Sequence, residues 1–170
     1  MEDTIILQVA GFKNSGKTTL INHWVSTIKD AGLSVVVIKH HGHGAKLDMP
    51  DETKDSMQYL ASGADASIVS GAGVTQYMIQ EQMELPGLMK LAYAQQPDVI
   101  LIEGFKMANY PKAVIVKNET DWEKLQDLSH IQLVIGLEKG IAFPQISSRE
   151  EQAALANWLL TWMNVYNGAE

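Results

Sequence analysis

Short apolar runs, several of them rich in β-branched residues, are distributed along the chain with room for a helix between most of them. Runs of this kind, bounded by turn residues, predict strands. The predicted strands cover 4–10, 34–39, 66–70, 98–103, 113–116 and 132–136. The continuous β-branched centre of 34–39 is typical of a strand covered on both faces, and we expect 66–70 to be buried as well. Residues 74–80 alternate weakly, which favours an exposed hairpin or an edge strand.

The segments between the runs carry apolar residues at helical spacing. Residues 17–29 predict an amphipathic helix, and shorter helices are predicted over 52–62 and from Pro86 to Tyr93. The last helix follows Ser147 and Ser148, each of which precedes a glutamate by three residues, as in a capping box. We expect its apolar stripe to dock on the sheet; the stripe consists of Leu155, Trp158, Leu159, Trp162, Met163 and Tyr166.

Strands that alternate with helices imply parallel pairing, because the chain must cross over between neighbouring strands. The pattern therefore predicts a three-layer α/β fold with a mostly parallel sheet flanked by helices. We predict a single domain over residues 1–170, since no segment has the composition of a linker. Open sheets of this class bind ligands at the carboxyl ends of their strands.

The amino-acid composition excludes several classes of site and surface. The chain has no cysteine, which excludes disulfides and thiolate metal sites, and its net charge of -7 argues against a nucleic-acid surface. The first residues are acidic and the apolar run after them is short, so we predict a cytoplasmic protein that does not enter the membrane. The basic residues comprise twelve lysines and one arginine, Arg149.

Residues 11–18 match the phosphate-loop motif G-x-x-x-x-G-K-[ST] and lie between a predicted strand and a predicted helix. Backbone N–H groups of such a loop point at an anion, and the helix dipole reinforces them. Lys17 is expected to reach the β- and γ-phosphates, Thr18 to ligate Mg²⁺ and Thr19 to contact the α-phosphate. The predicted nucleotide-binding residues are Gly11, Asn14, Ser15, Gly16, Lys17, Thr18 and Thr19. This motif makes the predicted fold a P-loop NTPase fold.

A magnesium site at this loop needs a carboxylate as well, and the strand at 98–103 begins with Asp98 and ends with Glu103. Five residue steps separate the two carboxylates by about 16 Å, so only one of them can reach the metal. The carboxyl-end rule selects Glu103 and places Asp98 at the far edge of the sheet.

Three histidines, His40, His41 and His43, follow the second predicted strand, and Asp48 comes after them. Asp48 is a candidate ligand of Mg²⁺ through water and, with Glu103, a candidate catalytic residue, whereas His40 or His41 is a candidate contact to a phosphorylated ligand. Two alternatives stay open: a transition-metal site built on the histidines, and an ordinary polar loop. The segment 116–121 is similarly open, because Asp121 could accept hydrogen bonds from guanine or could belong to a polar turn.

The combination of several motifs resembles a known family. GFKNSGKTTL at 11–20, IKHHGH at 38–43, the Asp48-Met-Pro and Gly63-Ala64-Asp65 segments, and DVILIEGFK at 98–106 are similar to the molybdopterin-guanine dinucleotide biosynthesis protein B (MobB) family. The resemblance runs from about residue 4 to residue 117. It implies a homodimer that binds GTP with Mg²⁺ and assists the molybdenum cofactor guanylyltransferase that attaches GMP to molybdopterin. It also implies contact with molybdopterin or its guanine dinucleotide, and weak GTP hydrolysis at most.

Three other functions are alternatives to this one, and two of them use the same scaffold. A small-molecule kinase recruits cations beyond the loop lysine, and an arginine near the γ-phosphate accelerates transfer about 10³- to 10⁵-fold. We expect Arg149 to be remote from the loop, which favours slow hydrolysis over a kinase. A metallochaperone GTPase usually carries cysteines or longer histidine tracts than those at 40–43. A pure interaction module would use the exposed segment 74–83 or the loop 104–112 as its partner surface.

Overall fold

A six-stranded parallel sheet forms the centre of the computed structural model, which describes residues 4–41, 47–137 and 140–167. The strand order is β2-β5-β1-β6-β7-β8, with β1 in the middle. The strands are β1 (Ile5–Gly11), β2 (Val35–Lys39), β5 (Val99–Glu103), β6 (Lys112–Ile115), β7 (Ile131–Ile135) and β8 (Gln145–Ile146). Parallel pairing confirms the predicted fold class.

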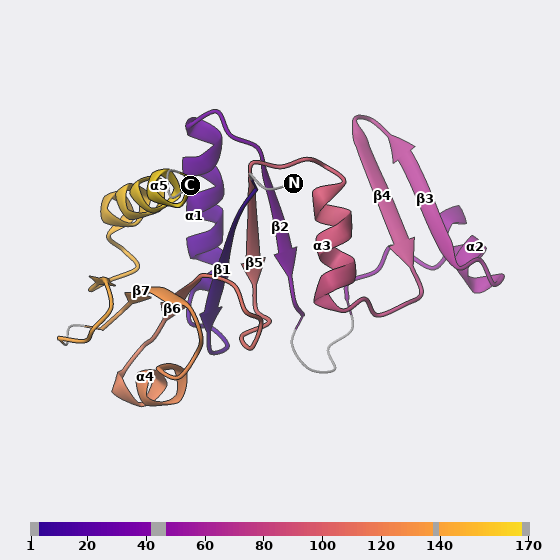
Figure 1. Ribbon diagram of the computed structural model, residues 1–170. Helices are drawn as coiled ribbons and strands as arrows, with labels where there is room; N and C mark the ends of the chain where they lie inside the picture. The colour runs from indigo at the N-terminus through magenta and orange to yellow at the C-terminus, as the bar shows by residue number, and fades with distance from the viewer. Residues whose placement is uncertain (1–3, 42–46, 138–139, 168–170) are drawn as a thin grey trace. The chain divides into compact units, whose positions relative to one another are not determined.

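Two layers of helices cover this sheet (Figure 1). Helices α1 (Lys17–Asp30) and α5 (Gln152–Asn167) pack on one face, where Leu7, Leu101 and Leu133 share a core with Trp24 and Leu159. The opposite face packs against α3 (Leu85–Tyr93) and α4 (Glu119–Leu125). Successive strand residues point to opposite faces, and helices cover both faces of the sheet, so the inner strands β1, β5, β6 and β7 are buried on both sides and are almost continuously apolar.

The chain divides into two units, and residues 43–84 form the smaller one. This unit contains α2 (Asp55–Ala61) and an antiparallel hairpin of β3 (Ala66–Gly71) and β4 (Val74–Ile79). The prediction of a hairpin at 74–80 is therefore confirmed. The prediction that 66–70 is a buried strand is wrong, because most of β3 is exposed and pairs only with β4.

Strand β2 also differs from its prediction. It pairs with β5 alone at the edge of the sheet, and Val37 is 41% exposed. The continuous β-branched run therefore forms a strand, as predicted, but it is not covered on both faces. Two short elements, α4 and β8, were not predicted, because each is too short for a hydrophobic period to develop.

The C-terminal helix follows its predicted pattern as far as Met163, whereas Tyr166 is exposed. Leu155, Leu159 and Met163 are buried against the sheet, and Trp158 stacks both on the buried Trp24 and on Trp162 along the same stripe. Glu151 accepts hydrogen bonds from the Ser147 hydroxyl and the Ser148 N–H, which satisfies a backbone donor ahead of the helix. No helix within the described residues is long and apolar enough to cross a bilayer.

Two buried polar side chains fix the loop that follows β5. Lys112 is fully buried, and its ammonium donates to the Ala108 and Tyr110 carbonyls. Gln8, paired with Lys112 across β1 and β6, donates to the Gly104 and Phe105 carbonyls. Together these two side chains fix the segment 104–110 through hydrogen bonds to its backbone carbonyls.

Replacing Lys112 with methionine is expected to lower the free energy of unfolding by about 1–3 kcal/mol, because the Ala108 and Tyr110 carbonyls lose their donor. Urea denaturation measures the change. The control is Lys90→Met at an exposed position of α3, for which we expect a change below about 0.5 kcal/mol. Equal stability of the Lys112→Met variant and the parent would contradict the anchoring role.

Candidate phosphate and metal site

The loop between β1 and α1 has the backbone that an anion nest requires. Asn14 and Gly16 adopt left-handed conformations, with φ of 59° and 96°, and Gly16 is the N-cap of α1. A side chain at Gly11 would lie 2.6 Å from the Ser15 hydroxyl and 2.9 Å from the Ile115 carbonyl. Both glycines of the motif are thus required sterically, and the loop delivers the N-terminus of α1 to the carboxyl edge of the sheet.

Lys17, the first residue of α1, donates from Nζ to the Phe12 carbonyl at 2.8 Å, which holds its ammonium over the loop. Burial lowers the pKa of Lys17 below 10.5, and the nearby Glu103 carboxylate opposes this shift. The like charges of Lys106, Lys39 and Lys117 lower it further. Several ammonium groups therefore surround the loop, although the chain as a whole is acidic.

Glu103 lies at the carboxyl end of β5, where it is 7% exposed, and both carboxylate oxygens are within reach of the Thr18 hydroxyl, at 3.3 and 3.2 Å. Asp98 precedes the opposite end of the same strand and accepts from the Ser34 N–H and hydroxyl, both at 2.6 Å. Those two hydrogen bonds lower the pKa of Asp98. The structure thus brings Glu103, and not Asp98, to the phosphate loop.

Lys39 is a site residue that the sequence analysis missed. It ends β2 directly beside Glu103 in the parallel register, and its ammonium lies 3.4 Å from Glu103 Oε2 and 3.3 Å from the Thr18 hydroxyl. The position of Lys39 at the end of a predicted strand could have identified it from the sequence. Lys39 and Glu103 each end a predicted strand, so the carboxyl-end rule applies to both residues equally.

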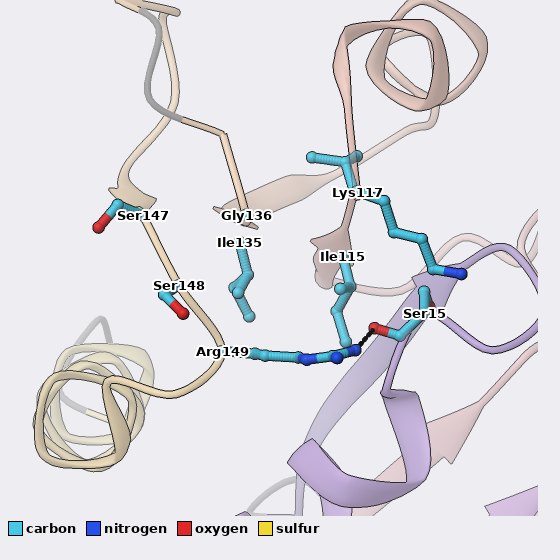
Figure 2. Close-up of a pocket in the computed structure, with 9 residues that line it drawn as sticks. Ser15, Ile115, Lys117, Ile135, Gly136, Ser147, Ser148 and Arg149 are labelled. Atoms are coloured by element: carbon cyan, nitrogen blue, oxygen red, sulfur yellow. Dashed lines mark hydrogen bonds between the residues drawn. The ribbon is translucent and has the colours of Figure 1, made fainter.

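A cavity of about 270 Å³ opens on the other side of the loop. Its walls come from Ser15, from the last residues of β6 and β7, and from the segments that follow β6, β7 and β8. Figure 2 shows Ile115 and Ile135 facing the extended side chain of Arg149 across the cavity. Because β1 lies in the middle of the sheet, the phosphate loop separates this cavity from Glu103 and Lys39. The Ser15 hydroxyl is buried there without a hydrogen-bond partner among the described residues.

The expectation that Arg149 is remote from the loop is wrong. Its guanidinium donates from Nη1 to the Ser15 carbonyl at 2.9 Å (Figure 2), and a side chain at Gly16 would collide with it at 2.6 Å. The short strand β8 ends immediately before Ser147 and returns the chain to the carboxyl edge of the sheet. Since β8 was not predicted, the sequence analysis had no means of placing Arg149.

The remaining predicted residues are less closely tied to the loop. His40 donates from its backbone N–H to the Glu103 carbonyl at 2.9 Å, and its ring contacts Phe105, with centroids 4.5 Å apart. His43 lies outside the described residues, and Asp48 belongs to the smaller unit of the chain. Over the described ranges, no three histidine, aspartate or glutamate side chains cluster as in a metal site, and His43 leaves that alternative untested.

Asp121 has a structural partner. Its carboxylate accepts from the Lys117 N–H at 3.1 Å, and its own N–H donates to the Asn118 side chain, which caps α4. Asp121 is not among the residues that line the cavity, whereas Lys117 is. The segment therefore has the contacts of a polar turn at the start of a helix.

Comparison with known proteins adds evidence from outside the chain. The family model described as Molybdopterin guanine dinucleotide synthesis protein B (MobB) matches residues 6–136, which is most of the chain and includes the phosphate loop and Glu103. The chain belongs to this family. The resemblance noted from the motifs is thereby confirmed.

Known members of the MobB family are similar to this chain over most of their length. A Bacillus subtilis protein named probable molybdopterin-guanine dinucleotide biosynthesis adapter protein is 42% identical over 129 residues, 76% of this chain and 75% of the relative. The crystal structure of Bacillus subtilis MobB superposes with a TM-score of 0.77 at 35% identity, covering 92% and 96% of the two chains. A MobB homolog from Bacillus stearothermophilus gives 0.76 at 31% identity, covering 94% and 98%.

Proposed function

We propose that the chain binds GTP with Mg²⁺ at the phosphate loop and acts as an adapter in molybdopterin-guanine dinucleotide biosynthesis. The observation that carries the nucleotide part is the contact between Thr18 and Glu103 at a complete phosphate loop. Membership of the MobB family, with relatives named as adapter proteins of that pathway, supports the second part and does not favour a kinase or a metallochaperone.

The Thr18 hydroxyl and the Glu103 carboxylate fit Mg²⁺, because both are hard oxygen ligands and the ion usually completes its shell with water and phosphate oxygens. In this proposal Lys17, with the backbone N–H groups of Asn14, Ser15 and Gly16, holds the phosphates, and Mg²⁺ supplies the charge that neutralises them. Affinity is then local, as a chain with a net charge of -7 requires. Thr19, His40 and Asp48 stay candidates for further contacts.

We place the nucleobase in the cavity on the opposite side of the loop. Ile115 and Ile135 provide apolar walls for a planar ring, and the Ser148 hydroxyl provides a hydrogen-bonding group at its edge. A pocket with apolar walls and a few polar groups is typical of small-ligand sites. GTP rather than ATP is proposed because the family acts in the synthesis of a guanine dinucleotide.

Arg149 forms the floor of this proposed base site and supports the loop through the Ser15 carbonyl. Lysine in its place keeps the charge but loses the planar fork, so Arg149→Lys is expected to weaken GTP binding about 3- to 10-fold, the cost of about one hydrogen bond. Calorimetry measures the affinity. Glu150→Gln, which removes the exposed partner of Arg149, is the control and should change it less than twofold. Equal weakening in both variants would contradict this role.

We propose hydrolysis that is weak at most. Arg149 is held by the Ser15 carbonyl on the cavity side of the loop, away from Glu103, and the like charges that lower the pKa of Lys17 are those of lysines. Lysine offers a point charge without the bidentate geometry that arginine brings to a transferring phosphoryl group. The reason differs from the one that the sequence suggested, because Arg149 is close to the loop but is already engaged.

The hairpin of the smaller unit supports a homodimer. Ile68 and Tyr77 lie opposite each other on one face, 68% and 44% exposed, and Val69 and Val74 are exposed on the other. A two-stranded hairpin with apolar faces is marginal alone and is usually covered. A second copy of the chain is the proposed cover, and the mass in solution by light scattering tests it, with twice the chain mass of 18.7 kDa expected.

The proposed partner is the molybdenum cofactor guanylyltransferase, with molybdopterin or its guanine dinucleotide as the shared ligand, in the cytoplasm where GTP is available. Immobilised chain should retain the guanylyltransferase in the presence of GTP and Mg²⁺, and should accelerate formation of the guanine dinucleotide from molybdopterin. If the chain neither retains the guanylyltransferase nor accelerates formation of the dinucleotide, the adapter function is contradicted.

A further inference from the structure

Lys39 occupies the position at which the proposed function places a cation. Its ammonium is 3.4 Å from Glu103 Oε2 and 3.3 Å from the Thr18 hydroxyl, and the same two groups are the proposed ligands of Mg²⁺. The three side chains thus form one cluster, in which a lysine ammonium already interacts with the oxygen atoms that a divalent ion would need.

The fold determines this placement. The parallel register pairs Lys39 with Glu103, so the last residues of β2 and β5 lie side by side at the carboxyl edge of the sheet. The backbone bond from the His40 N–H to the Glu103 carbonyl continues the ladder past the side chains. The Glu103 side chain is only 9% exposed, whereas that of Lys39 is 51% exposed and has room to move into solvent.

Charge explains why the arrangement is favourable. A carboxylate that is largely removed from water is destabilised unless a cation or hydrogen-bond donors compensate it. Lys39 supplies the cation and Thr18 the donor when no metal is present. A divalent ion on the same oxygens would lie within a few ångströms of the ammonium, and like charges at that distance repel strongly.

We propose that Lys39 is an internal counter-ion that excludes free divalent cations from the Thr18–Glu103 site until Mg²⁺ arrives together with a nucleotide. The ammonium then moves away from Glu103 through its exposed side. This inference rests on the proposed magnesium site and adds to it a residue that determines when the metal binds. It makes the metal site dependent on the nucleotide and gives Lys39 no catalytic role.

The test uses Mn²⁺ alone, with no nucleotide, and measures bound ion by the loss of the free-ion electron paramagnetic resonance signal. Lys39→Met is expected to bind Mn²⁺ at least about tenfold more tightly than the parent chain, and Lys39→Arg should stay like the parent because it retains the charge. The double variant Lys39→Met, Glu103→Gln should lose the gain. A matched control, Lys29→Met, makes the same change of net charge near the far end of α1, about 17 Å along the helix from the loop.

Equal Mn²⁺ affinity of Lys39→Met and the parent would overturn the inference, as would an equal gain in Lys29→Met or a gain that survives Glu103→Gln. Thermal unfolding followed by circular dichroism establishes that each variant is folded. Since the assay contains no nucleotide, its result is independent of GTP binding. If the parent chain fails to bind GTP in a separate titration, the proposed function fails, whereas a Glu103-dependent gain in Mn²⁺ affinity still supports the role of Lys39.

Discussion

Replacing Lys17 with alanine is expected to weaken Mg²⁺–GTP binding at least about 100-fold. The ammonium lies over the phosphate loop, where it is partly buried, and its proposed contacts are charge-assisted hydrogen bonds to two phosphates. Each such bond contributes about 1.5–3 kcal/mol, and two together exceed the factor of 100. Isothermal titration calorimetry at fixed Mg²⁺ measures the change.

Lys13→Ala is the matched control for Lys17→Ala. Lys13 is in the same loop and carries the same charge, but its side chain is exposed and it precedes the nest residues Asn14, Ser15 and Gly16. It should change the affinity no more than about threefold, since an exposed charge is screened by water and salt. If Lys17→Ala binds GTP as the parent does, or if both variants lose binding equally, the phosphate loop is not the site.

The second large effect is expected at Glu103. Glutamine keeps the shape of the side chain but removes the charge, so Glu103→Gln should reduce the Mg²⁺ dependence of GTP affinity at least about tenfold. Affinity in excess EDTA should fall little, because the loop backbone and Lys17 remain. The measured quantity is the ratio of the GTP dissociation constants without and with Mg²⁺.

Asp98→Asn makes the same change of charge at the other end of β5, about 16 Å away, and should leave that ratio unchanged. The substitution is expected to change the free energy of unfolding and its dependence on pH. The Ser34 hydrogen bonds lower the pKa of Asp98, so the stabilisation is present above the ordinary carboxyl pKa and is lost as the pH falls toward the lowered value. A changed metal ratio in Asp98→Asn but not in Glu103→Gln would reverse the assignment of the two carboxylates.

The sequence predicts the middle of the sheet and the phosphate loop well, because the strand–turn–helix pattern and the phosphate-binding motif occur in the same residues. Residues 11–18 must form a tight turn between a strand and a helix, and the structure places Gly16 in the left-handed conformation required. Glu103 could be selected over Asp98 because the two lie at opposite ends of one strand and only one end faces the ligand edge.

What the sequence could not provide is the lateral order of the strands. Lys39 is a site residue only because β2 lies next to β5, and Arg149 reaches Ser15 only because β8 extends the opposite edge of the sheet. Strand 66–70 was expected to be buried because apolar residues predict burial without saying whether a sheet or a second chain covers them. These three errors share one cause, which is that spacing along the chain carries little information about neighbours across the sheet.

In the proposed function, the phosphate loop, Thr18 and Glu103 bind GTP together with Mg²⁺. Calorimetric titration of the full chain with GTP and with ATP, each in Mg²⁺ and in EDTA, tests it most directly. One GTP per chain, bound at least about tenfold more tightly with Mg²⁺ than without and in preference to ATP, is the predicted result. Binding of ATP alone, or no nucleotide binding under any of the four conditions, would contradict it.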